Sequence, residues 1–334
     1  MNGMLTRNLV LREVQPSSSK MIEIDGRGWI YLVAFLVDGK YVVSGDREGK
    51  IRRWQVKDGT EVGTPTDVGS TAFSIAVSRD GKWIVGGTRE GQVQVWNADD
   101  GKRVAKIRAH SNWVNAVDVS PDPTKIASGS DDNTACVWSR STGQRLLGPW
   151  KHNDRVFAVK FSPDGRFIAT ATQKFFRIYD GHDDNLVVNV PTEVPFSLNY
   201  SLAWSSNSKQ LFVVSSGKII CISASTGATL SQWSIHSDKY NCIALACDGE
   251  FIAASSGSSV SFWDTMTHEQ IGSVVEHTAD VDSMALSANH DIVIGGGNKI
   301  TLRSLCNTLP SPYWNNVVST FESRTRLAAQ RTTP

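Results

Sequence analysis

Short runs of alternating apolar and polar residues follow one another along most of the chain. The clearest set comprises residues 114–119, 126–130 and 134–138, separated by Pro121-Asp122 and by Asp131-Asp132-Asn133. Alternation with a period of two predicts half-buried strands, and the residues between the runs favour tight turns. Residues 144–147 can supply a fourth, outer strand. This part of the chain therefore predicts a small antiparallel sheet of four strands.

The last residue of the third strand recurs at nearly constant spacing. It reads Trp54, Trp96, Trp138, Tyr179, Ile222, Trp263 and Arg303, at intervals of 42, 42, 41, 43, 41 and 40 residues. Such a period, with a strand that ends in Trp, is typical of a β-propeller. Seven units predict one all-β domain over residues 1–310, a seven-bladed β-propeller of four-stranded antiparallel blades.

Sequence motifs at the turns carry a family resemblance. They are Ser-Pro-Asp-Gly at residues 162–165, Ser-Gly-Ser-Asp-Asp-Asn-Thr at residues 128–134, and the recurring Trp. With these motifs the chain resembles the WD-repeat (Trp-Asp repeat) β-propeller family over about residues 22–308, although only Trp263-Asp264 is a literal Trp-Asp. The degenerate, propeller-only layout is similar to the expanded WD-repeat sets of fungi.

A propeller must join its last blade to its first, or it leaves an open sheet edge. The resemblance implies that an N-terminal strand completes the last blade, and residues 8–14 read as a lone strand ahead of the first unit. We therefore expect residues 8–14 to close blade seven. Residues 311–334 lie outside the repeat, and Ser319 with Glu322 forms a capping box for a short helix. This tail is either a frayed end or a docking peptide.

The resemblance also implies a hydrogen-bonded network of His, Ser or Thr, Asp and Trp within a blade. The third unit has all four, at His110, Ser128, Asp132 and Trp138. Ser, His and Asp together also suggest a hydrolase triad. We favour the structural interpretation, because these four residues would lie along one blade and bind its hairpin turn to the incoming loop.

Residues just before the predicted inner strands have no common core role and differ in chemistry. Counting back from each inner strand gives Trp29, Thr71, Trp113, Arg155, Leu198, Lys239 and Asp280. Trp and Arg dominate the hot spots of protein interfaces. Trp29, Trp113, Arg155, Lys239 and Asp280 are therefore candidate partner contacts on the rim, with Arg47 and Arg89 of the hairpin turns as weaker ones. Alternatively, neighbouring loops shield the two Trp residues, Arg155 pairs with Asp154 or Asp132, and the repeated Arg-Glu-Gly is turn chemistry.

Composition narrows the remaining choices. The net charge is +1, from 34 basic and 33 acidic residues, which disfavours nucleic acid as a partner. No stretch approaches 18 apolar residues and no secretory signal is recognisable, so we expect the cytoplasm, with the nucleus as second choice. Five Cys residues without a Cys-x-x-Cys motif predict free thiols. Cys242, Cys247 and His236 are the alternative metal ligands, but they lack a fourth at suitable spacing, so we expect neither a metal nor a cofactor.

These features together predict a non-catalytic protein–protein interaction scaffold or adaptor. It would bind partner peptides or proteins on its rim, as a monomeric propeller within a larger complex. The alternatives are the substrate-recognition subunit of a ubiquitin ligase and a chromatin or histone-tail reader. A propeller enzyme is remote, because the sequence shows no paired carboxylates, metal-spaced His residues or nucleophile elbow.

Overall fold

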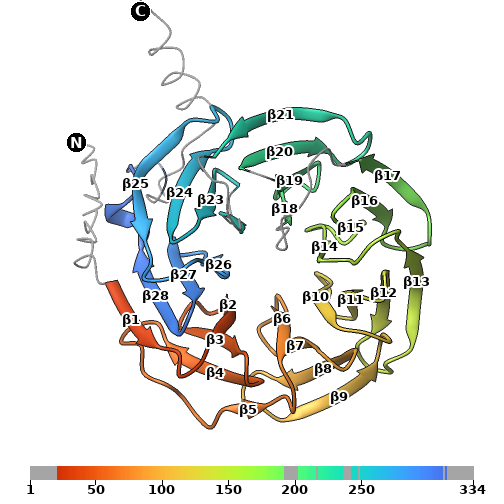
Figure 1. The fold of residues 1–334 in the computed structure, drawn as a ribbon, viewed down its shortest axis with the longest axis horizontal. Coiled ribbons are helices and arrows are strands. Elements are labelled where there is room, and N and C mark those ends of the chain that lie inside the picture. Colours follow the sequence, from red (N-terminus) through yellow and green to blue (C-terminus); the bar gives the residue numbers. More distant parts are fainter. Residues whose placement is uncertain are drawn as a thin grey trace, which may run out of the picture.

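Seven sheets are arranged in a ring around a central channel in the computed structural model of the chain (Figure 1). The structure describes residues 21–191, 202–215, 217–235, 242–246, 249–310 and 313. Each sheet has four antiparallel strands. The predicted seven-bladed, all-β propeller is therefore confirmed. We number the blades one to seven by the order of their inner strands along the chain.

The strands alternate in direction from the channel outward. The inner strands are β2 (Ile30–Phe35), β6 (Ala72–Val77), β10 (Val114–Val119), β14 (Ala158–Phe161), β18 (Leu202–Trp204), β22 (Ile243–Leu245) and β26 (Ser283–Leu286). The second strands are β3 (Tyr41–Asp46), β7 (Trp83–Thr88), β11 (Lys125–Ser130), β15 (Phe167–Ala171), β19 (Gln210–Ser215), β23 (Phe251–Ser256) and β27 (Asp291–Gly296).

The third strands carry the recurring Trp position. They are β4 (Lys50–Gln55), β8 (Gln92–Asn97), β12 (Thr134–Ser139), β16 (Phe175–Asp180), β20 (Lys218–Ser223), β24 (Ser259–Asp264) and β28 (Lys299–Ser304). The outer strands are β5 (Thr66–Asp67), β9 (Arg103–Arg108), β13 (Arg145–Lys151), β17 (Leu186–Pro191), β21 (Thr229–Ser234), β25 (Gln270–Glu276) and β1 (Met21–Asp25).

Blade seven combines the two ends of the repeat, since β1 lies beside β28 (Figure 1). The register runs from Met21 opposite Arg303 to Asp25 opposite Lys299. An N-terminal strand thus closes the last blade, as predicted, but that strand is β1. Residues 8–14, which were expected in this position, lie outside the described residues.

The core lies between neighbouring blades. One cluster joins Val93 and Val95 of blade two to Val114, Ile126 and Trp138 of blade three. Apolar side chains on facing blades bury each other, because each sheet is too small to bury its apolar face alone.

Glycine in a second strand permits the close approach of the next blade. A Cβ atom on Gly129 would lie 2.5 Å from a methyl carbon of Val156 in blade four, a distance at which one of the two must move. Gly87 is in the same situation against Val114, with a Cβ distance of 2.6 Å. The small residues in this strand therefore set the spacing between blades.

A short segment after β28 packs against blade six. It contains the 3-10 helix η1 (Leu305–Asn307), followed by buried Leu309. The hydroxyl of Tyr313 donates to Asp264 Oδ2 at 2.6 Å, and the Ser273 N–H donates to the Thr308 carbonyl. Of residues 311–334 the structure describes Tyr313, and the predicted tail helix lies outside the described residues.

Candidate functional site

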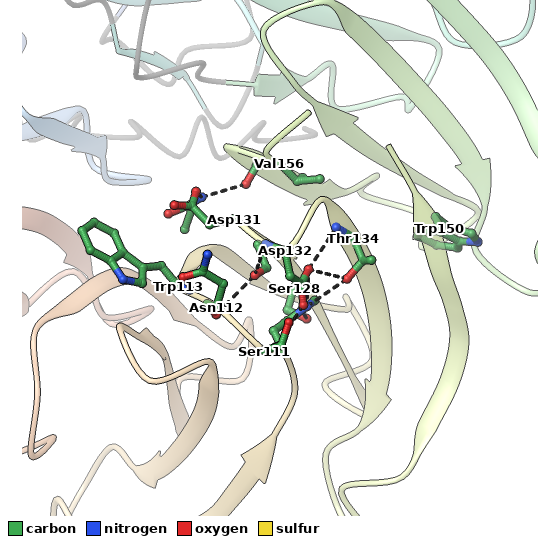
Figure 2. Close-up of polar contacts among 12 residues, drawn as sticks. Ser111, Asn112, Trp113, Ser128, Asp131, Asp132, Thr134, Trp150 and Val156 are labelled. Carbon is green, nitrogen blue, oxygen red and sulfur yellow. Dashed lines mark hydrogen bonds and ion pairs between the residues drawn. The ribbon is translucent and has the colours of Figure 1, made fainter. Parts of the chain in front are cut away.

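Blade three holds a continuous polar network between its second and third strands (Figure 2). His110 Nε2 is 2.7 Å from Ser128 Oγ, and His110 Nδ1 is 3.0 Å from Asp132 Oδ2. The indole N–H of Trp138 donates to Ser128 Oγ at 2.8 Å. Asp132 also accepts from the Ser111 and Thr134 N–H groups. The structure thus brings together all four residues named for this network.

The ionisation of Asp132 reflects these bonds. Partial burial acts to raise the pKa of its carboxyl, but the hydrogen bonds from His110 and Thr134 outweigh it, and the pKa falls well below the ordinary value. Asp132 is therefore a carboxylate at neutral pH, which suits its role as acceptor for several donors.

Ser128, His110 and Asp132 also have the order of contacts found in a hydrolase triad. However, Ser128 is fully buried within the blade, and its hydroxyl already accepts from Trp138. A substrate carbonyl has no path to that oxygen. The arrangement fastens the hairpin turn to the loop before β10, which is the structural interpretation.

Other blades keep parts of this network. Trp54 donates to Ser44 in blade one, and His152 Nε2 lies 3.0 Å from Thr170 Oγ1 in blade four. In blade six Trp263 donates to Ser261 of its own strand, and the Ser261 hydroxyl reaches the second strand through the Ala254 carbonyl at 3.4 Å. His277 of blade seven contacts Thr301. Burial lowers the pKa of His152 to about 4, so this imidazole is neutral.

Those predicted rim and hairpin residues that the structure describes lie on one face of the ring, which we call the rim face. It is formed by the loops before the inner strands and by the turns between second and third strands. In the first three blades the two sets are joined by backbone hydrogen bonds, from Arg47 to Trp29, from Arg89 to Thr71 and from Asp131 to Trp113. The rim face is therefore held by main-chain contacts, while its side chains vary.

Trp113 makes two ring contacts on this face (Figure 2). Its ring stacks on Phe73 of blade two, with centroids 4.8 Å apart and planes 11° apart. The Arg89 guanidinium lies over the Trp113 ring, with its Cζ 4.8 Å from the ring centroid. Trp113 remains partly exposed. Tyr31 of blade one continues the row, with its ring centroid 5.9 Å from that of Phe73.

Trp29 and Arg155 belong to the loops before β2 of blade one and β14 of blade four. Trp29 is 52 % exposed, and its indole N–H donates to Asp282 Oδ2 at 2.9 Å. The exposed Arg155 pairs with Asp131, at 3.4 Å between Nη1 and Oδ2. Neither of the expected Arg155 partners forms that ion pair, although the Arg155 N–H donates to Asp154. Neighbouring loops therefore cover neither the Trp29 ring nor the Arg155 guanidinium completely.

The remaining rim candidates are less well placed. Asp280 is exposed on the rim face. Arg47 is also exposed, and its side chain forms no hydrogen bond or ion pair within the described residues. Lys239 lies outside the described residues, as do Cys247 and His236.

Three residues that sequence counting missed complete the surface. Tyr31, Phe73 and Asp282 lie two positions after Trp29, Thr71 and Asp280, and they line the central channel of about 470 Å³. Residues i and i+2 of a strand share a face, so alternation from the rim positions would have found them. We call Trp29, Tyr31, Phe73, Arg89, Trp113 and Asp282 the mouth cluster.

Among the described Cys residues, Cys242 lies at the channel. Cys136, Cys221 and Cys242 are free and buried, and burial raises the pKa of each to about 11. Cys242 lines the channel but is fully buried against Ser255 and Val281. Within the described ranges no group of three or more His, Cys, Asp or Glu residues could hold a metal ion.

The part of the chain that the structure describes contains no helix of the length and hydropathy needed to cross a bilayer.

Comparison with known proteins now places the chain. No curated protein matches it. The model of the IFT122 first beta-propeller matches residues 71–303, and that of the WD domain, G-beta repeat, matches residues 19–55. The first match covers more than half of the chain and spans the blades from the loop before β6 to β28. The protein therefore belongs to this family of β-propellers, which is built from WD repeats.

Proposed function

We propose that this protein is a non-catalytic interaction scaffold that binds a segment of a partner protein on its rim face. WD-repeat propellers are generally scaffolds for protein interactions. The observation that supports a site on this face is the mouth cluster. It consists of the hydrogen-bonded pair Trp29 and Asp282 and of the row of contacts that runs from Tyr31 through Phe73 and Trp113 to Arg89.

The mouth cluster has the properties of a binding surface. Large rings carry most of the energy of an interface when a partner covers them, and the rings here are already fixed by stacking and by hydrogen bonds. Little side-chain freedom is therefore left to lose when a partner binds. The cluster spans blades seven, one, two and three, which suits an extended segment that crosses the channel mouth.

The experiment is a co-purification of partners with the tagged full chain from its own cells. A triple variant, Trp29→Ala, Trp113→Ala and Arg155→Ala, should lose partners that the unaltered protein retains. The matched control changes three exposed apolar residues of the outer strands, Val104→Ala, Leu146→Ala and Leu230→Ala. An identical partner list for the folded triple variant and the unaltered protein would refute the assignment to the rim face.

A further inference from the structure

The charges around the channel mouth are unevenly paired. Arg89 lies over the ring of Trp113, and Arg155 is paired with Asp131. On the side of blade seven, Asp280 and Asp282 have no cationic nitrogen within 4 Å among the described residues. The mouth therefore presents acidic groups without a counter-charge next to basic groups that already have partners.

Asp282 is the more significant of the two carboxyls, because it is half-buried and faces the channel. Burial raises the pKa of this carboxyl, and the neighbouring Asp280 acts in the same direction, against the hydrogen bonds from Trp29 and from the Gly297 N–H. An ionised carboxylate in such a place is poorly solvated. A cation brought beside it would recover that lost solvation energy.

Aromatic rings border the same space. Tyr31 and Phe73 line the channel together with Asp282, and their planes are 36° apart. The exposed ring of Trp29 is bonded to the carboxylate. Ring faces attract ammonium and guanidinium groups, and a carboxylate at the edge adds direct attraction. At about 470 Å³ the channel has room for one or two side chains, but not for a folded domain.

We propose that the channel mouth receives a basic side chain, Arg or Lys, from an extended partner segment, with Tyr31 and Phe73 against its cation and Asp282 as counter-charge. This inference deepens the proposed function and rests on it. Arg89 and Arg155 lie farther along the same face, so they set a limit on how many basic residues the segment carries. The partner is therefore a segment with one buried cation rather than a polybasic tract.

The test uses a random heptapeptide library displayed on phage and panned on the immobilised full chain. The expected result is enrichment of peptides with Arg or Lys at one fixed position. A synthetic copy of the leading peptide should bind about tenfold or more weakly when citrulline or norleucine replaces that residue, because half-buried charge pairs contribute at least this much. This peptide-side change needs no protein variant.

The protein-side variant is Asp282→Asn, which keeps an oxygen to accept from Trp29 and removes the charge. This substitution should weaken the binding of the leading peptide by a similar factor. Asp99→Asn is the matched control, because this exposed carboxyl lies in the turn between third and outer strands of blade two, on the opposite face. The control should bind the peptide within twofold of the unaltered chain.

The outcomes separate this inference from the proposed function. Enriched peptides without a basic residue whose binding is lost in Trp113→Ala would overturn the cation site and leave the scaffold on the rim face intact. Failure to enrich any peptide, or binding that is indifferent to both Trp113→Ala and Asp282→Asn, would count against both.

Discussion

Ser128 occupies the point at which the polar side chains of blade three meet. Its hydroxyl oxygen accepts from the Trp138 indole and lies within hydrogen-bonding distance of His110. In a buried site every unpaired donor or acceptor costs about 1–3 kcal/mol, so the value of the network lies in its completeness. Blades one and four have fewer residues in this network, so a single substitution there should lower the free energy of unfolding less.

Asp132→Ala should destabilise the protein by about 2–4 kcal/mol, because it removes the acceptor for His110, Ser111 and Thr134. Chemical denaturation checks this value. The control is Glu90→Ala at the equivalent turn of blade two, where the side chain is exposed, and it should change stability by less than about 0.5 kcal/mol. Equal effects of the two substitutions would mean that the network contributes nothing.

His152 makes the stability of the protein depend on pH, over a range that lies above the one in which Asp132 contributes. Its folded pKa of about 4 lies below the ordinary value of 6.5 for a histidine side chain. As pH falls from about 6.5 towards 4, the unfolded chain binds a proton that the folded chain does not, so stability decreases. The slope from one such group is at most about 1.4 kcal/mol per pH unit.

His152→Gln should therefore flatten the dependence of the denaturation midpoint on pH between 7.5 and 5. Some slope remains, because burial also lowers the pKa of His277. A slope that His152→Gln does not alter would show that this imidazole titrates alike in the folded and unfolded chains. The contribution of Asp132 lies lower, since its depressed pKa means that stability is lost as pH falls below about 4.

The position of the closing strand β1 depends on the short link that joins it to β2. Four residues separate β1 from β2, and within this link Gly26 donates to the Asn298 carbonyl at 2.8 Å. The segment immediately before β2 is therefore the one held beside β28. Residues 8–14 have a longer apolar run than β1, so the alternation pattern alone favours them as the closing strand. Alternation, however, carries no information on which strand pairs with which.

Deletion of residues 1–15 should leave the melting temperature unchanged, whereas deletion of residues 1–26 should lower it by at least about 10 °C or cause aggregation. The longer deletion exposes the edge of β28 and uncovers the cluster in which Ile24 packs with Trp54. Thermal unfolding with light scattering measures both effects. Equal melting of the two truncated proteins would show that β1 does not support blade seven.

A single substitution gives the same test without truncation. Ile24 is 6 % exposed and lies opposite Ile300. Ile24→Ala should cost about 2–4 kcal/mol through lost burial and the cavity left behind. Met21→Ala, at an exposed position of the same strand, is the matched control and should cost little.

The recurring Trp position was enough to predict the architecture, because a repeat reports one structural unit many times. It was not enough to predict the contacts of the rim. Trp29 and Trp113 follow from counting residues within the repeat, but the pairing of Arg155 with Asp131 joins blade four to the hairpin of blade three. Likewise Phe73 stacks on Trp113 across two blades. Such contacts depend on the spacing between blades, which small residues such as Gly129 set and no local pattern reveals.

On the scale of the whole molecule, the blades differ in how firmly their strands are joined. Blade three has the complete network, whereas Trp263 of blade six bonds within its own strand. Native-state hydrogen exchange should therefore give stronger protection to the amides of β11 and β12 than to those of β23 and β24. In Asp132→Ala this difference should become smaller. Equal protection in the unaltered protein would indicate that the ring opens as one cooperative unit.

The closure of blade seven also has a consequence for biosynthesis. Asp25 pairs with Lys299, so the ribosome must add 274 more residues (299 − 25) before the partner of the first described strand exists. At about 5–20 residues per second this takes roughly 14–55 s. During that interval Ile22 and Ile24 have no β28 to cover them, and the growing ring keeps an open edge. Newly made chains are thus exposed to wrong pairing until β28, the last strand of the ring, has been translated, which is the period in which a chaperone would be of most use.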